Sequence, residues 1–144
     1  KKAILQHPLS KRIEMIEGSS IDLKTFRKVK KKTGIGKKIL VCLDSNHTHE
    51  HVKKELQLYG PLVSKGSYIV VFDTVVEDLP KYFFNDRPWG PGDNPKTAVL
   101  EYIEELEKHS FYGEDGDLLK FQIDKEIENK LLITVAPSGY LERM

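Results

Sequence analysis

The chain has 144 residues, of which 39% are hydrophobic and 31% charged, as expected for one globular domain and not for a disordered segment. Its 23 basic and 22 acidic residues give a net charge of +1, so the overall charge does not indicate nucleic-acid binding. A single cysteine excludes a disulfide framework, and the lack of a signal peptide or of an apolar run of ~20 residues predicts a cytoplasmic protein without a membrane span.

Strand and helix signals alternate from the start of the chain. Residues 12–17 have the pattern of a short strand, and Asp22 can cap a lysine-rich helix over residues 23–32. Residues 38–43 form a continuous apolar run, which predicts a strand buried on both faces. Cys42 lies inside this run, so we expect its thiol to be buried.

The middle of the chain continues this alternation. Residues 49–59 place apolar side chains at helical spacing, and residues 67–72 form a second buried strand. Residues 79–96 are rich in proline and glycine around Trp89 and show no clear element, which is typical of a functional loop. An amphipathic helix is predicted over residues 97–109.

The last third of the chain has two further strand signals, at residues 119–123 and 131–135. The short link over residues 124–129 favours an antiparallel hairpin. Together the elements predict an α/β fold whose sheet is mostly parallel and ends in an antiparallel hairpin.

Two aspartates, Asp44 and Asp73, directly follow the two buried strands. The carboxyl ends of parallel strands share one edge of a sheet, which is where α/β proteins bind ligands. Neighbouring strands lie about 5 Å apart, and two carboxylates at that spacing suit a hard divalent cation. The alternative is that both aspartates only cap the elements that follow them.

Three histidines, His47, His49 and His51, follow Asp44 closely. A helix that begins near His47 would place His47 and His51 on one face, as a transition-metal site requires. The alternative is that all three lie on the surface near a helix start. His47 is the best candidate for a general base, because it is three residues from Asp44 and near the same edge.

Several longer motifs resemble the cephalosporin hydroxylase family, which includes rhamnosyl O-methyltransferases. They are LDSNHTHEHV at 43–52, PLV at 61–63, GSYIVVFDT at 66–74, RPWGPGDNP at 87–95, KLLIT at 130–134 and PSGYL at 137–141. The resemblance implies a Rossmann-like methyltransferase fold that uses S-adenosylmethionine. It also implies a hydroxyl acceptor on a sugar or natural product, as in polysaccharide biosynthesis, and it leaves room for a homo-oligomer.

The resemblance also assigns roles to residues of this chain. Asp44 and Asp73 stand at the positions of divalent-metal ligands, with Mg²⁺ as the expected ion. Thr74 stands where a third ligand is found in related enzymes, although a hydroxyl is a weaker ligand than an amide. His47 takes the place of a catalytic lysine, and Trp89 is expected to form one wall of the acceptor pocket.

The run Gly18-Ser19-Ser20 resembles the segment beside the adenine of the cofactor, and Asp44 is expected to border the same site. The family's first two strands and its glycine-rich loop have no counterpart here. Residues 1–144 are therefore interpreted as the C-terminal part of one methyltransferase-like domain that lacks the first two strands. Two other functions remain open at this stage: a metal-dependent hydrolase that uses the three histidines, and a non-catalytic binding or oligomerisation domain.

Overall fold

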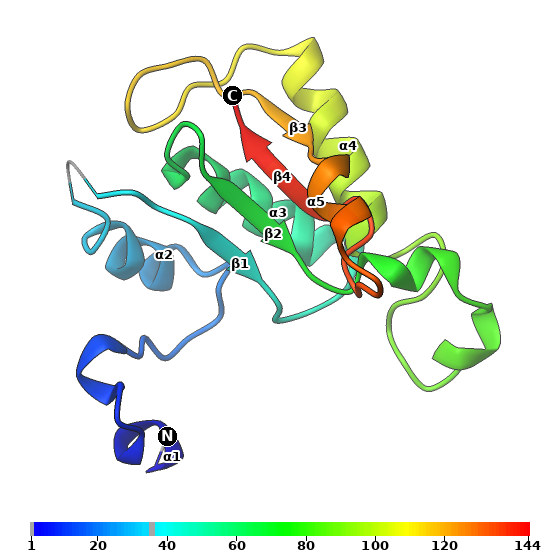
Figure 1. Cartoon of the computed structure of the whole chain (residues 1–144), viewed down its shortest axis with the longest axis horizontal. Coiled ribbons are helices and arrows are strands. Elements are labelled where there is room, and N and C mark those ends of the chain that lie inside the picture. Colours follow the sequence, from blue (N-terminus) through cyan, green and yellow to red (C-terminus); the bar gives the residue numbers. More distant parts are fainter. Residues whose placement is uncertain (1, 35–36) are drawn as a thin grey trace.

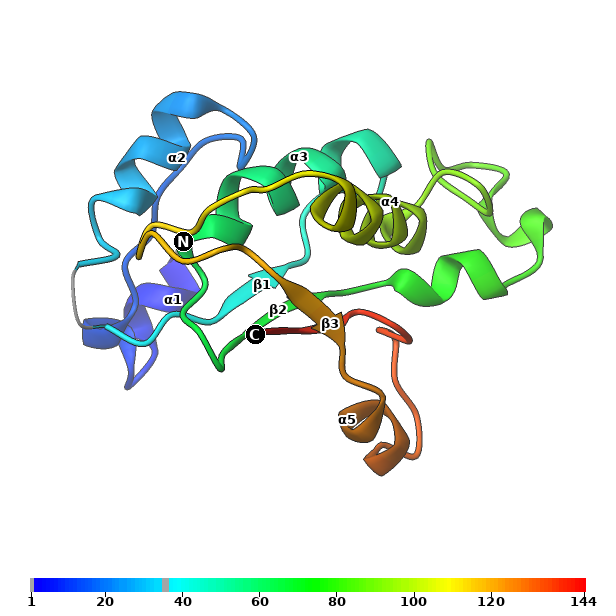
Figure 2. The same cartoon turned by 90° about the horizontal axis from the view of Figure 1, so that it is seen from above.

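The computed structural model describes residues 2–34 and 37–144. Its centre is a four-stranded sheet, and Figures 1 and 2 show the helices α2, α3 and α4 together on one face, with α5 on the other. The strands are β1 (Val41–Leu43), β2 (Tyr68–Val71), β3 (Phe121–Ile123) and β4 (Tyr140–Arg143). The helices are α1 (Lys2–Gln6), α2 (Leu23–Lys30), α3 (His49–Tyr59), α4 (Pro95–Lys108) and α5 (Lys125–Lys130).

The strand order in the sheet is β1-β2-β4-β3. β1 and β2 pair in parallel, with Leu43 opposite Val71, whereas β4 is antiparallel to both β2 and β3. Three strands thus run in one direction and β4 opposes them. The expectation of a mostly parallel sheet therefore holds for strand direction, but β1–β2 is the one parallel pair among the described strands.

The core lies between the sheet and helices α3 and α4. Leu56 of α3, Val99 of α4, Ile69 and Val71 of β2 and Leu141 of β4 are all fully buried there. Helix α3 has the bounds that its apolar spacing predicted. The alternating burial of β2 and β4 shows that each strand turns one side chain in two toward these helices.

The opposite face of the sheet is less well covered, and one prediction fails there. Cys42 is exposed, and so is Leu40 just before β1. β1 is an edge strand of the described sheet, and α5, the helix on this second face, packs against β4. The prediction that residues 38–43 are buried on both faces was therefore wrong, because no described element covers the second face of β1.

The strand predicted over residues 12–17 is also absent from the described structure. Ser10–Arg12 form a short 3₁₀ helix, the chain then continues without regular structure to Gly18, and Ile13 and Met15 are exposed. A strand needs a partner for its backbone hydrogen bonds. Figure 1 shows this arm, in dark blue, well separated from the sheet.

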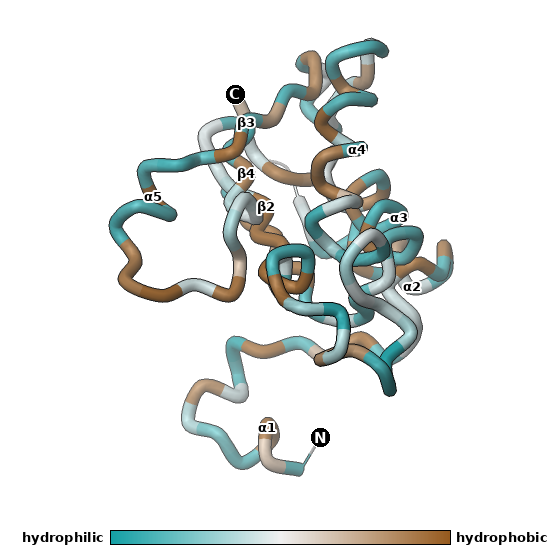
Figure 3. The backbone as a smooth tube through the Cα atoms, turned by 90° about the vertical axis from the view of Figure 1, so that its right-hand side faces the viewer, coloured by the Kyte–Doolittle hydropathy of each residue, from teal (hydrophilic) through white to brown (hydrophobic). Residues whose placement is uncertain are grey.

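The second strand of the C-terminal hairpin was placed too early. The predicted link contains helix α5, whose first N–H groups bond to Asp124. Residues 131–135 form an exposed loop, with Leu132 99% exposed, and Figure 3 shows these apolar residues after α5. The strand that pairs is β4, which follows Gly139. A Cβ at Gly139 would lie 2.2 Å from the carbonyl oxygen of Val71, so only glycine permits this approach.

Candidate active site

Asp44 and Asp73 lie side by side at the carboxyl edge of the parallel pair. Each follows its strand within two residues, and the N–H of Phe72 donates to the carbonyl of Leu43 at 3.0 Å. Asp73 has a left-handed backbone conformation, with φ of 56°, at the start of the 3₁₀ helix Thr74–Asp78. This sharp change of direction ends β2 and turns the chain at the edge of the sheet.

His47 lies between the two carboxylates. Its Nδ1 atom is 3.1 Å from Oδ2 of Asp73, and its Nε2 atom is 3.6 Å from Oδ1 of Asp44. One ligand atom from each of the three residues falls within 4.8 Å of the others. His47 is 17% exposed, Asp73 35% and Asp44 63%, so the cluster is open to solvent on the Asp44 side. The sequence expectation that Asp44 and Asp73 approach one another is confirmed.

The position of His47 is fixed by the loop between β1 and α3. The side chain of Asn46 accepts hydrogen bonds from the backbone N–H and the hydroxyl of Thr48, both at 2.9 Å. This Asx turn ends the loop just before α3 begins. The imidazole of His47 also packs against the indole of Trp89, with 5.0 Å between the ring centroids and 44° between the planes. The cluster is therefore in direct contact with the loop that carries Trp89.

A pocket of about 490 Å³ opens beside this cluster. Apart from His47 and Asp73 its lining is mostly apolar and aromatic: Val75, Val76, Leu79, Phe83, Phe84, Arg87 and Trp89. The Arg87 guanidinium carbon lies 5.7 Å from the centroid of the Trp89 ring. Aromatic faces with a few polar groups at one end are suited to a sugar or another ring that carries a hydroxyl.

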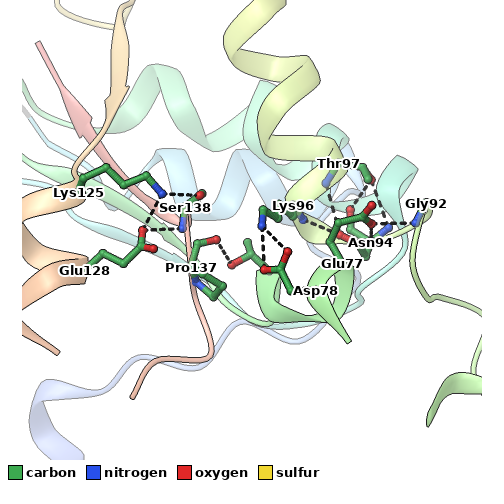
Figure 4. A network of polar contacts seen from close by, with 11 residues as sticks. Glu77, Asp78, Gly92, Asn94, Lys96, Thr97, Lys125, Glu128, Pro137 and Ser138 are labelled. Carbon is green, nitrogen blue, oxygen red and sulfur yellow. Dashed lines mark hydrogen bonds and ion pairs between the residues drawn. The ribbon is translucent and has the colours of Figure 1, made fainter. Parts of the chain in front are cut away.

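The Trp89 loop, residues 79–94, is held by a polar network around the buried Asn94 that the sequence did not predict. The Glu77 carboxylate accepts from the backbone N–H of Gly92 at 2.8 Å and from the side-chain amide of Asn94. Asn94 is fully buried, caps helix α4 and also donates to the carbonyl of Gly90 at 2.9 Å. Figure 4 shows this group, with Lys96 bonded to Asp78 next to it.

Thr74 does not join the carboxylates. It is fully buried, and its hydroxyl donates to the carbonyl of Pro137 at 2.7 Å. Within residues 2–34 and 37–144, the group that could hold a metal ion consists of Asp44, His47 and Asp73. The third member of the cluster is therefore the histidine that the sequence marked as a base.

The three histidines do not come together. Helix α3 begins at His49, so His47 precedes it and shares no helical face with His51. His49 lies 2.8 Å from the Thr97 hydroxyl and 2.7 Å from the carboxylate of Glu101, both on α4. His51 instead lies near the hydroxyls of Ser20 and Ser45, at 3.1 and 3.3 Å. This separation removes the structural basis for a hydrolase site built from all three.

The Gly18-Ser19-Ser20 turn lies against helices α2 and α3. Gly18 has φ of 145°, and a Cβ there would lie 2.2 Å from the hydroxyl of Thr25, so glycine is required. The carbonyl of Ser20 accepts from the Tyr59 hydroxyl at 2.8 Å. Ser20 and Asp44 line one pocket of about 480 Å³, which extends along the open side of β1. Gly18 and Ser19 shape this turn but do not line that pocket.

Comparisons with known proteins place the chain in one family. The model of the rhamnosyl O-methyltransferase/CmcI family matches residues 1–144. A rhamnosyl O-methyltransferase of Mycobacterium tuberculosis H37Rv is 33% identical over 129 residues, which are 89% of this chain and 46% of that protein. The Mycobacterium leprae protein of the same name is 30% identical over 109 residues, 74% of this chain and 39% of its own length.

The fold and the strand-end cluster define the chain as part of an α/β protein with a candidate active site at the carboxyl edge of its sheet. The chain belongs to the rhamnosyl O-methyltransferase/CmcI family. It spans about half the length of the curated relatives it matches. No solved structure matches it significantly. Among the described residues, no helix has the length and apolar character needed to cross a membrane.

Proposed function

We propose that the protein carrying this chain is an S-adenosylmethionine-dependent O-methyltransferase that acts on a saccharide hydroxyl with the help of a divalent metal. The observation that carries the proposal is the approach of Asp44, His47 and Asp73 next to an aromatic pocket. The relatives named rhamnosyl O-methyltransferase support both the reaction and the acceptor class.

The donor set fits a divalent ion. Two carboxylates and an imidazole within 4.8 Å are ligand types that Mg²⁺ or Mn²⁺ accepts, with carboxylate oxygens preferred by Mg²⁺. Asp44 and Asp73 would hold the ion. A bound metal supplies positive charge that lowers the pKa of a hydroxyl. The proposal leaves Thr74 out of the ligand set because its hydroxyl is committed to Pro137.

His47 is assigned as the general base. Its ring packs against Trp89 and lines the aromatic pocket where an acceptor hydroxyl would lie. Its Nδ1 atom is 3.1 Å from Asp73, and its Nε2 atom is 3.6 Å from Asp44. When bound, S-adenosylmethionine would supply the methyl group for the acceptor oxygen, and His47 would take the proton that the hydroxyl loses. Trp89 and its aromatic neighbours bind the ring and exclude water. Ser20 and Asp44 line the pocket assigned to the adenosine side.

The test is methyl transfer from labelled S-adenosylmethionine to a rhamnose-containing acceptor with the whole protein. Asp44→Asn and Asp73→Asn should each lower kcat at least a hundredfold, as expected when a group that stabilises developing charge is removed. Asp117→Asn is the matched control, because Asp117 is an exposed aspartate outside the cluster. Unchanged activity in both cluster variants would remove the metal from the proposal.

A further inference from the structure

A second polar cluster joins helix α3 to the pocket beside β1, and its central member is buried. Glu55 is only 2% exposed, although it carries a carboxyl group, and its helix neighbours Val52 and Leu56 are core residues. Its Oε1 atom accepts a hydrogen bond from the hydroxyl of Ser45 at 2.8 Å. Within the described part of the chain, its buried Oε2 atom has no hydrogen-bond partner.

The cluster continues from Glu55 to the glycine-serine turn. The Nε2 atom of His51 lies 3.3 Å from the Ser45 hydroxyl and 3.1 Å from the Ser20 hydroxyl. The carbonyl of Ser20 is held by Tyr59 at the end of the same helix. Glu55, Ser45 and Ser20 all line the pocket beside β1. The contacts therefore connect helix α3, the residue after Asp44 and the turn at residues 18–20.

A carboxyl group in this position does not favour stability on its own. A buried polar atom without a partner lowers stability relative to a satisfied one, and an apolar side chain would fit the core side of α3 better. What Glu55 adds is a fixed donor and acceptor direction for the hydrogen bonds of the cluster. The Ser45 hydroxyl donates to the Oε1 atom of Glu55. The Ser45 oxygen is then left as an acceptor for His51 or Ser20.

We propose that Glu55 is a positioning residue for the cofactor side of the site, acting through Ser45 and His51 to fix Ser20. This inference rests on the proposed function, since it assigns the pocket beside β1 to S-adenosylmethionine. Glu55 does not touch the reacting atoms. It acts by ordering a turn that otherwise belongs to the exposed N-terminal arm, and so it lowers the conformational entropy lost when the cofactor binds.

The first experiment uses the whole protein without any cofactor. Hydrogen exchange of the backbone amides at residues 18–21 is compared in the unsubstituted protein, in Glu55→Gln and in Glu50→Gln. Glu50 is exposed on the same helix and serves as the control. We expect exchange at the turn to rise about tenfold in Glu55→Gln only, which is the effect of one lost hydrogen bond. Equal exchange in all three proteins would overturn the inference, and equal melting temperatures would show that the variant is folded.

The second experiment measures the dissociation constant of S-adenosylhomocysteine for the whole protein in a double-mutant cycle. Glu55→Gln and Ser45→Ala should each raise Kd about tenfold. Because the two residues act in series, the Kd of the double variant should be no higher than that of the single variant with the higher Kd. KM for the cofactor should rise while kcat at saturation is unchanged. If the two losses of affinity add up in the double variant, or if both single variants bind normally, this inference is overturned and the proposed function is not affected. An unsubstituted protein that binds no S-adenosylhomocysteine would overturn the proposed function and this inference with it.

Discussion

The side chain of Asp93 accepts a hydrogen bond from the backbone N–H of His49 at 2.7 Å. One end of this contact is the first turn of helix α3, and the other is the loop that carries Trp89. This hydrogen bond holds the Trp89 loop against the segment that positions His47. The aromatic wall of the pocket and the proposed base are therefore fixed relative to one another.

Asp93→Ala should loosen the Trp89 loop. The loss of an acceptor at a helix start lowers the free energy of unfolding by about 1 kcal/mol. Trp89 is the single tryptophan of the chain, so acrylamide quenching of its fluorescence reports on this loop alone, and quenching should increase in the variant. Asp86→Ala, at an 82% exposed position of the same loop, is the control. Equal quenching in both variants would show that the Asp93 contact does not hold the loop.

Gly139→Ala should destabilise the fold strongly. The added Cβ would meet the Val71 carbonyl, a backbone atom that cannot move without disturbing the pairing of β2 and β4. Overpacking of this kind lowers the free energy of unfolding by about 2 kcal/mol or more. Urea denaturation measures the change. Gly34→Ala, whose Cβ would have its nearest contact among the described residues at 3.9 Å, with Lys37, should leave stability nearly unchanged.

The buried Arg143 predicts an acid-dependent contribution to stability. Its guanidinium lies 2.6 Å from Asp115, is 2% exposed, and holds the pKa of that carboxyl below its usual range. The folded state therefore favours the ionised form, and the stabilisation is present above about pH 4 and is lost as the pH falls through the lowered folded-state pKa.

Asp115→Asn should therefore be less stable than the unsubstituted protein near neutral pH, by about 1 kcal/mol once solvent screening of this half-exposed carboxylate is allowed for. The difference should shrink at the lowest pH at which the protein still folds. Chemical denaturation across this pH range measures it. A difference that stays constant with pH would mean that the Arg143–Asp115 pair is not its source.

Replacement of His47 separates its two conceivable roles. If His47 is the base, His47→Gln should lower kcat by a factor of about 10²–10⁴ and leave metal affinity nearly unchanged. If it is instead a ligand, the affinity for Mn²⁺ should fall together with activity. His49→Gln is the control, because His49 bonds to Thr97 and Glu101 outside the cluster.

The sequence predicted the parts of the fold that depend on local patterns. The apolar spacing of α3 and the two apolar runs that each end in an aspartate predicted the helix, the strands and the approach of Asp44 to Asp73. β4 was missed because its short sequence has a weaker strand signal than residues 131–135. The choice between them depends on which segment can approach Val71, and that is decided by Gly139 in three dimensions.

The polar supports of the site could not be predicted in the same way. Glu77 and Glu55 have ordinary surroundings in the sequence, and their partners, Asn94 and Ser45, lie 17 and 10 residues away. Their burial depends on how α3 and α4 pack against the sheet. The sequence does contain one signal for Glu55. It lies between Val52 and Leu56, so the helical period places this glutamate at a core-facing position.

Titration of Mn²⁺ or Mg²⁺ into the whole protein by calorimetry tests most directly whether Asp44 and Asp73 hold a divalent metal ion. We predict saturable binding of one ion per chain that is abolished in both Asp44→Asn and Asp73→Asn and retained in Asp117→Asn. No saturable binding, or binding that survives both cluster substitutions, would contradict the account.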